Sequence, residues 1–188
     1  HRDLHYPLRR QRRMCIRDRI RILLGLFVVG LLLSGLTAFP IKTEVDFLQR
    51  VFGEGSPTQT WWPWLARWIS HVHRGVTEAS ENYPFLFYGT DWLAFAHIVI
   101  AVAFIGPLRD PVRNVWVVEF GMIACVLVIP AAMICGPIRG IPLFWRLIDC
   151  SFGVVGIIPL YLAQRAIGNL ADAGAGHGFR RRPVKAVI

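Results

Sequence analysis

This sequence has little charge and no recognisable catalytic motif. Only 18% of its 188 residues are charged, which is too few for an ordinary soluble domain. There is no phosphate-binding glycine loop, nucleophile elbow or HExxH pattern. The four cysteines form no CxxC pair and no zinc-binding spacing. From these absences we expect a protein that is not an enzyme, with no catalytic residue, no metal site and no bound cofactor.

The sequence is instead rich in long hydrophobic runs. Hydrophobic residues make up 54% of the chain, and the mean hydropathy is +0.46. A run of about 20 apolar residues can cross a bilayer as a helix. Transmembrane helices are predicted at about 20–39, 90–106, 115–135 and 143–163. In the first run Gly30, Ser34 and Ala38 recur every four residues, which predicts a face for close helix packing. We predict an all-α fold, a polytopic four-transmembrane-helix bundle in which residues 20–165 form one membrane domain.

The N-terminal segment resembles a translated sequencing adapter over residues 1–18. Met14 to Asp18 can be read back as ATG TGT ATA AGA GAC, a transposase end sequence. We interpret residues 1–19 as non-native, the alternative being a basic cytoplasmic tail. These residues hold seven Arg and two Asp, so the net charge falls from +9 to +4 without them. Because the basic excess is then small, we expect no nucleic-acid partner.

Two amphipathic patterns occupy residues 41–89, between the first two spans. Thr43 followed by Asp46 resembles a capping box at the start of the first pattern. The second pattern places apolar and polar residues on opposite faces of a helix. We therefore predict an amphipathic helical hairpin that lies on the membrane surface or caps the bundle. Its tryptophans are expected to anchor it among lipid headgroups, and they are Trp61, Trp62, Trp64 and Trp68.

Basic residues predict the orientation of the chain. Arg109 and Arg113 share a short loop, and the tail 166–188, which we expect to be disordered, is also basic. Short cytoplasmic loops carry an excess of Lys and Arg. We therefore expect both termini in the cytoplasm, and the hairpin in the periplasm of a bacterium, beside its inner membrane. Near the inner surface, Glu119 is expected to form an ion pair with Arg109 or Arg113.

Charged residues inside apolar runs are costly and indicate a site. Arg146 and Asp149 lie three residues apart on one helix face, where they can pair directly. At about 1.5 Å per residue, both lie at the depth of His97, in the outer third of the membrane. The predicted polar cluster consists of His97, Arg146, Asp149, Asp91 and Arg139. This cluster is either a functional site or a structural lock, and Asp91 is also a candidate helix cap.

Several functions are compatible with such a protein. It is either a small transporter, with the polar cluster lining a cavity, or an accessory subunit that docks other membrane subunits through its hairpin. The alternative is a redox protein that binds quinone or haem between the spans. A b-type haem needs two axial ligands. Since His97 is the only histidine in the four runs, His73 or a methionine would have to supply the second. The lipid bilayer is an expected partner in every case.

Three segments resemble a small bacterial four-helix inner-membrane protein family of uncharacterised activity. They are FYGTDWLAFAH at Phe87–His97, GPLRDP at Gly106–Pro111 and ICGPIRGIP at Ile134–Pro142. The resemblance covers roughly residues 20–165. It implies a four-helix inner-membrane protein and implies no activity.

Overall fold

The computed structural model describes residues 5–175, with side chains described from Met14 to Asp172. Within these residues the chain is helical and contains no strand. It divides into two compact units, one formed by His1–Val28 with Ala103–Ile188 and the other by Val29–Val102. The helix α1 (His5–Ala38) contributes to both units. It begins within the segment that resembles adapter, and a helical backbone carries no information about the origin of those residues.

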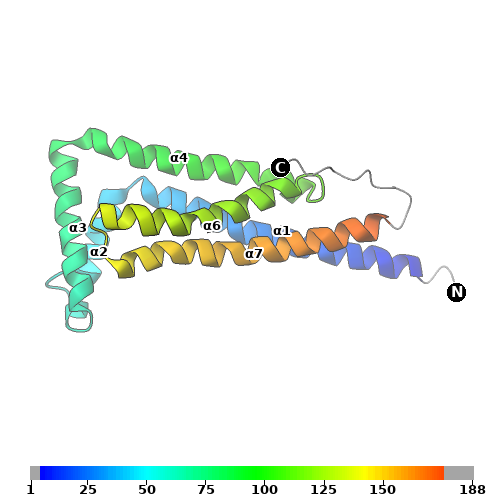
Figure 1. The fold of residues 1–188 in the computed structure, drawn as a ribbon, viewed down its shortest axis with the longest axis horizontal. Helices are drawn as coiled ribbons and strands as arrows, with labels where there is room; N and C mark the ends of the chain where they lie inside the picture. The colour runs from blue at the N-terminus through cyan, green and yellow to red at the C-terminus, as the bar shows by residue number, and fades with distance from the viewer. Residues whose placement is uncertain (1–4, 176–188) are drawn as a thin grey trace. The chain divides into compact units, whose positions relative to one another are not determined.

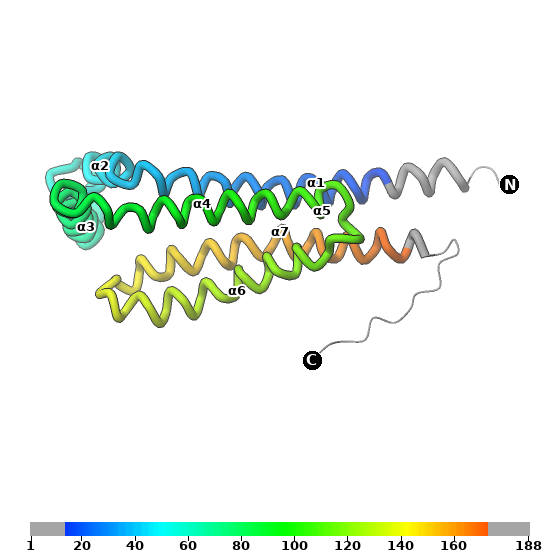
Figure 2. Tube along the Cα trace, turned by 90° about the horizontal axis from the view of Figure 1, so that it is seen from above, coloured from blue at the N-terminus to red at the C-terminus, as the bar shows by residue number. Residues whose placement is uncertain are grey.

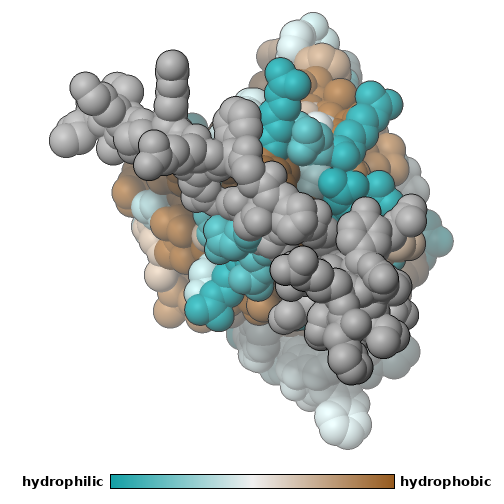
Figure 3. All heavy atoms as spheres, turned by 90° about the vertical axis from the view of Figure 1, so that its right-hand side faces the viewer, coloured by the Kyte–Doolittle hydropathy of each residue, from teal (hydrophilic) through white to brown (hydrophobic). Residues whose placement is uncertain are grey.

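Within the residues that the structure describes, four helical segments are long and apolar enough to cross a membrane. They are Met14–Ala38, Pro84–Arg109, Val115–Ile138 and Leu143–Asp172. The prediction of four such segments is confirmed, and each is longer than the run predicted from the sequence. Many of their large apolar side chains lie at the surface, among them Leu26 and Phe152. In the end view of Figure 3, hydrophobic residues are visible between and behind hydrophilic ones. Soluble monomers rarely expose apolar surface on this scale.

The unit Val29–Val102 contains the predicted hairpin. Its helices are α2 (Ile41–Phe52) and α3 (Pro63–Asn82), joined through the 3-10 turn η1 (Pro57–Thr60). The two helices lie side by side in Figure 1. Val45 of α2 and Ile69 of α3 are buried, as the apolar stripes predict. A second 3-10 turn, η2 (Pro84–Phe87), leads into α4 (Tyr88–Ala103).

The other unit is built around a pair of antiparallel helices. A short helix α5 (Ile105–Arg109) precedes α6 (Val115–Ile138) and α7 (Leu143–Ala175). α6 and α7 run side by side in the two views of Figures 1 and 2. A Cβ atom added at Gly153 of α7 would collide with the carbonyl oxygen of Cys125 in α6. The backbones therefore approach closely at a position that only glycine permits.

A glycine turn reverses the chain between α6 and α7. Gly140 has a φ of 70°, a left-handed conformation that side chains with a Cβ rarely adopt. Its amide donates to the carbonyl of Pro137, and the amide of Ile141 donates to that of Gly136. These bonds satisfy carbonyls at the end of α6. The helix consequently runs on to Ile138, three residues beyond the predicted end of the run.

The closest packing point of α1 within the unit Val29–Val102 differs from the predicted one. A Cβ added at Gly35 would lie 2.7 Å from the Cβ of His97 and 3.3 Å from the carbonyl oxygen of Ala94. At Gly30, by contrast, an added Cβ would meet nothing within 4 Å. The repeat of small residues predicted close packing at Gly30, Ser34 and Ala38. In the structure, the residue of α1 that lies against α4 is Gly35.

The prediction of a disordered tail from residue 166 is wrong for its first ten residues. α7 continues without a break to Ala175. Ala166, Ile167 and Leu170 are buried, and their spacing of one, three and four residues places them on one side of the helix. Burial of these apolar side chains favours the continued helix. The rest of the predicted tail, residues 176–188, lies outside the described residues.

Candidate functional site

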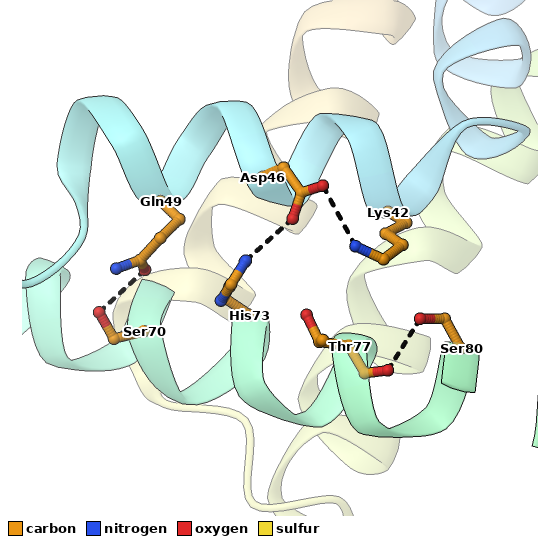
Figure 4. Close-up of polar contacts among 7 residues, drawn as sticks. All are labelled: Lys42, Asp46, Gln49, Ser70, His73, Thr77 and Ser80. Carbon is orange, nitrogen blue, oxygen red and sulfur yellow. Dashed lines mark hydrogen bonds and ion pairs between the residues drawn. The ribbon is translucent and has the colours of Figure 1, made fainter. Parts of the chain in front are cut away.

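A group of polar side chains that forms two sets of hydrogen bonds lies between α2 and α3. It is called the seam here and consists of Lys42, Asp46 and Gln49 of α2 with Ser70 and His73 of α3. Figure 4 shows these side chains pointing toward one another across the two helices. On α2 they follow one another at four and three residues, and on α3 at three. This spacing places each set on one helix face, beside the buried apolar residues of the same helix.

Asp46 is the centre of the seam. Its Oδ1 accepts a hydrogen bond from His73 Nε2 at 2.9 Å, and its Oδ2 lies 3.3 Å from Lys42 Nζ. Since an ionised carboxylate only accepts, the Nε2 of His73 carries the proton. The hydrogen bond from His73 holds the pKa of the Asp46 carboxyl below its usual value; desolvation opposes this effect and Lys42 adds to it. Asp46 therefore ties its own helix to α3 through a charged group.

Ser70 forms the second connection of the seam. Its side chain is 6% exposed, and its hydroxyl donates to Gln49 Oε1 at 2.9 Å. The hydroxyl oxygen of Ser70 also accepts a hydrogen bond from the backbone amide of Glu54 at 2.9 Å. The hydroxyl of Thr58 likewise donates to the carbonyl of Val51. Together these bonds fix the loop that joins α2 to α3.

The seam holds the groups of a nucleophile–base–acid triad without their geometry. A triad needs a hydroxyl hydrogen-bonded to the histidine that its carboxylate orients. The Ser70 hydroxyl is engaged by Gln49 and Glu54 instead. The Thr77 hydroxyl oxygen is buried and has no hydrogen-bond partner within the part of the chain that the structure describes. The hydrogen bonds of the seam therefore connect α2 to α3 and do not form a catalytic triad.

The sequence pattern gave a different role to Asp46. A capping box would have used Asp46 at the start of α2, but the residue at the cap position is Pro40, and α2 has no side-chain cap. The Asp46–His73 contact joins residues 27 positions apart. A signal was present in the sequence, because polar residues recur at helical spacing on both helices. It could not show that the two polar faces meet.

The predicted ion pair between Arg146 and Asp149 is not formed. Neither residue belongs to an ion pair among the residues that the structure describes. The Arg146 stem packs instead over Gly136 at the end of α6, where an added Cβ would collide with Arg146 Cδ. Its Nε is buried and lacks a hydrogen-bond partner among the described side chains. The direction of the Arg146 side chain is therefore set by close packing against Gly136 and not by attraction to the Asp149 carboxylate one turn away.

The remaining members of the predicted cluster lie on other elements. His97 belongs to α4, where its Nδ1 donates to the carbonyl of Leu93 at 2.7 Å. Asp91 is in the first turn of α4 and does not cap it, because the helix starts earlier, at Tyr88. Arg139 is exposed at the end of α6. Since His97 and Asp91 belong to one compact unit and the other three residues to the second, their meeting in one layer stays a prediction.

Glu119 has a partner other than the predicted ones. Its Oε1 accepts a hydrogen bond from Gln164 Nε2 of α7 at 3.4 Å. Arg109 and Arg113 form no ion pair with it among the described residues, so the expected pairing is corrected. The loop before α6 is held by polar contacts of its own. The amide of Arg113 donates to Asp110 Oδ1, and Asn114 Nδ2 donates to the carbonyl of Asp110.

The tryptophans of the hairpin differ in exposure. Trp61 is 79% exposed, and Trp62 and Trp64 are 47% and 46% exposed. Trp68 is half-buried, with its ring 5.7 Å from that of His71. Their role as headgroup anchors stays a prediction.

The redox alternative also stays a prediction. His73, one of the residues named as a possible second haem ligand, has its Nε2 engaged by Asp46. Among the described residues no three His, Cys, Asp or Glu side chains come together as a possible metal site.

Comparison with protein-family models, curated proteins and solved structures gave no match to this chain. The resemblance to a bacterial four-helix inner-membrane family therefore stays a prediction.

Proposed function

We propose that this chain is a multi-pass membrane protein that acts as an accessory subunit, with the α2–α3 hairpin as its docking element. One observation carries the proposal. The polar side chains of the seam face one another and are hydrogen-bonded between the helices, while large aromatic side chains lie outside. Phe47 of α2 is 60% exposed and Trp61 is 79% exposed.

The physical reason is the conformational entropy that a flexible element loses when it binds a partner. An element that is already folded loses little conformational freedom when it binds, so more of its contact energy becomes affinity. The seam fixes α2, α3 and their connecting loop before any partner arrives. Exposed tryptophan and phenylalanine then supply the kind of side chain in which interface cores are enriched.

Purification of the full chain from its native membrane in mild detergent tests this function. We expect a partner subunit in fixed stoichiometry, and its loss from the Phe47→Ser and Trp61→Ser variants. Arg67→Gln is the matched control, because it changes an exposed residue of the same hairpin without removing aromatic surface. Retention of the partner by both aromatic variants would contradict the proposal.

The competing role of these aromatic residues is membrane anchoring. Quenching of tryptophan fluorescence by lipids labelled at known depth distinguishes the two roles. Strong quenching that Trp61→Ser abolishes, with partner binding unchanged, would favour anchoring and exclude docking through Trp61.

We also propose a bacterial inner membrane with both termini in the cytoplasm. The support is the basic loop of Arg109 and Arg113, since short cytoplasmic loops carry such residues. The hairpin would then lie in the periplasm. A cysteine placed at Ser56, in the loop between α2 and α3, should react with an impermeant thiol reagent in intact spheroplasts. Reaction only after lysis would reverse the orientation.

A small proton-coupled transporter is the second candidate, and Arg146 and Asp149 favour it. Both lie in the candidate span Leu143–Asp172 without pairing with each other, and unpaired charge in a span commonly marks a transport path. If this is the function, Asp149→Asn and His97→Ala abolish a proton-coupled flux in proteoliposomes and leave the thermal unfolding temperature unchanged. A flux that survives both substitutions excludes this role.

A further inference from the structure

A row of aromatic rings covers one face of α4 at its start. Tyr88, Trp92 and Phe95 are spaced by four and three residues, which places them on the same side of the helix. They are 64%, 55% and 52% exposed. The ring centroids of Tyr88 and Trp92 are 6.0 Å apart at 90°, and those of Trp92 and Phe95 are 5.6 Å apart at 86°. The plane of the Trp92 ring is therefore nearly perpendicular to the planes of the Tyr88 and Phe95 rings.

A carboxylate completes this face. Asp91 lies three residues after Tyr88 and four before Phe95, and the four side chains line a shallow pocket of about 250 Å³. Asp91 is the only carboxylic acid among the four lining residues, and it makes no hydrogen bond or ion pair within the described residues. The pocket therefore combines three aromatic rings with one uncompensated negative charge.

These features match one ligand chemistry. The face of an aromatic ring attracts a cation through its quadrupole, and Trp does so best. Aromatic cages with an adjacent acid are suited to organic ammonium groups. The ring faces attract the cation, and the carboxylate can also accept a charge-assisted hydrogen bond from a primary ammonium. A pocket of this volume is below the usual size for a drug-like ligand, roughly 300–1,000 Å³, and is large enough for an ammonium headgroup.

We propose that this pocket binds the ammonium headgroup of a zwitterionic phospholipid. The source is a lipid because the pocket occupies the first two turns of α4, near the end of the candidate span Pro84–Arg109. Tyr and Trp gather at that level in membrane proteins, where lipid headgroups meet water. The inference requires the chain to cross a membrane, and it does not depend on the hairpin docking a partner.

Lipid titration of the purified full chain in detergent tests the proposal, with bound lipids counted by native mass spectrometry. Phosphatidylethanolamine and phosphatidylglycerol of the same short acyl chains share a phosphate and differ in the ammonium group. The wild-type chain should bind phosphatidylethanolamine about tenfold more tightly. Equal affinity for the two lipids would overturn the proposal.

Substitutions assign that preference to the pocket. Asp91→Asn keeps the shape and removes the charge, so the affinity ratio should fall to near one. Trp92→Leu should have the same effect, whereas Asp91→Glu should keep most of the preference. Trp61→Leu is the control, because it removes an exposed tryptophan that lies outside the pocket. A tenfold preference that persists in Asp91→Asn and Trp92→Leu would place the lipid elsewhere and overturn the proposal.

Two further measurements keep the result interpretable. The helical circular dichroism and gel-filtration profile of each variant establish that it is folded. If Asp91→Asn fails this check, the comparison of Trp92→Leu with Trp61→Leu decides whether the pocket carries the lipid preference.

Free ethanolamine is added as a competitor to separate the two sources of ammonium, a membrane lipid and a free amine. It should displace the lipid only at far higher concentration, and displacement at the lipid's own concentration would overturn the assignment to a membrane lipid. Loss of a co-purifying subunit leaves this lipid ratio unchanged, so the two proposals fail separately.

Discussion

The hairpin α2–α3 and the pair α6–α7 are both made of two adjacent helices, and they are held together in opposite ways. α2 and α3 meet through polar side chains beside an apolar core, with Asp46 and Ser70 making the connecting bonds. α6 and α7 meet through small residues, where Gly153 lies against the backbone of Cys125 and Gly156 faces the Cys125 side chain. The first contact relies on directed bonds and the second on close approach.

The difference is the one expected if the hairpin lies in water and the pair α6–α7 lies in lipid. In water, burial of an apolar stripe drives two helices together, and polar bonds at its edge select the register. In lipid, an apolar side chain gains little by moving from lipid to protein, so close packing over small residues must supply the attraction. The contrast between hairpin and helix pair therefore supports a membrane environment for α6 and α7.

The largest expected effect comes from filling the gap at Gly153. Gly153→Ala places a methyl group against the carbonyl oxygen of Cys125 and should destabilise the chain by about 1–3 kcal/mol. Gly168→Ala is the matched control on the same helix, since an added Cβ there meets nothing within 4 Å. It should leave stability unchanged or raise it by roughly 0.5–1 kcal/mol. Thermal unfolding in detergent measures both, and equal behaviour would contradict close packing at Gly153.

A somewhat smaller effect is expected in the hairpin. Ser70→Ala removes a buried hydroxyl that bonds Gln49 and the amide of Glu54, and it should cost about 1–2 kcal/mol. Ser80→Ala is the control, because that hydroxyl donates only within α3, to the carbonyl of Thr77, and it should cost less than about 0.5 kcal/mol. Hydrogen exchange of the α2 and α3 amides measures local stability. Identical exchange in the two variants would show that the seam does not hold the hairpin.

Arg146 belongs to the pair α6–α7 and carries a charge, so substitutions there show whether packing or charge contributes more to the stability of this pair. Arg146→Ala should lower stability by about 1 kcal/mol through lost packing of its stem over Gly136. Arg139→Ala, at an exposed position, should have little effect. Arg146→Met retains most of the stem and should restore most of the loss. If Arg146→Met is as unstable as Arg146→Ala, the charge matters more than the packing.

The smallest effect is expected from the partly exposed carboxylate of Asp46 in the seam. The pKa of Asp46 is lowered in the folded chain, so the unfolded chain takes up a proton more readily. Its carboxylate therefore stabilises the hairpin above its usual pKa of 3.8, and this contribution disappears as pH falls through the lowered value. Asp46→Asn should reduce the loss of α2–α3 protection in acid, whereas Glu44→Gln, on the same helix outside the seam, should not. Added salt should weaken the effect, and an unchanged acid profile in Asp46→Asn would contradict it.

Local pattern was a good guide to the elements of this fold. The four spans were predictable because a run of apolar residues has to be about 20 residues long to cross a bilayer, and the two hairpin helices because apolar residues recur at helical spacing. The same pattern misled where tertiary packing was decisive. The tail helix continues because Ala166, Ile167 and Leu170 are buried, and a composition rich in Gly and charge did not reveal that burial.

Apart from the continuation of α7 to Ala175, the sequence by itself determined which segments are helical, which are apolar enough for a membrane and which are amphipathic, because these properties depend on neighbours within a few residues. Only the tertiary structure decided that Asp46 meets His73, that Gly35 rather than Gly30 lies against α4, and that Arg146 packs over Gly136 instead of pairing with Asp149. Each of those contacts depends on how one helix is rotated and shifted against another. That choice is made by the fit of both surfaces together, and neither segment encodes it alone.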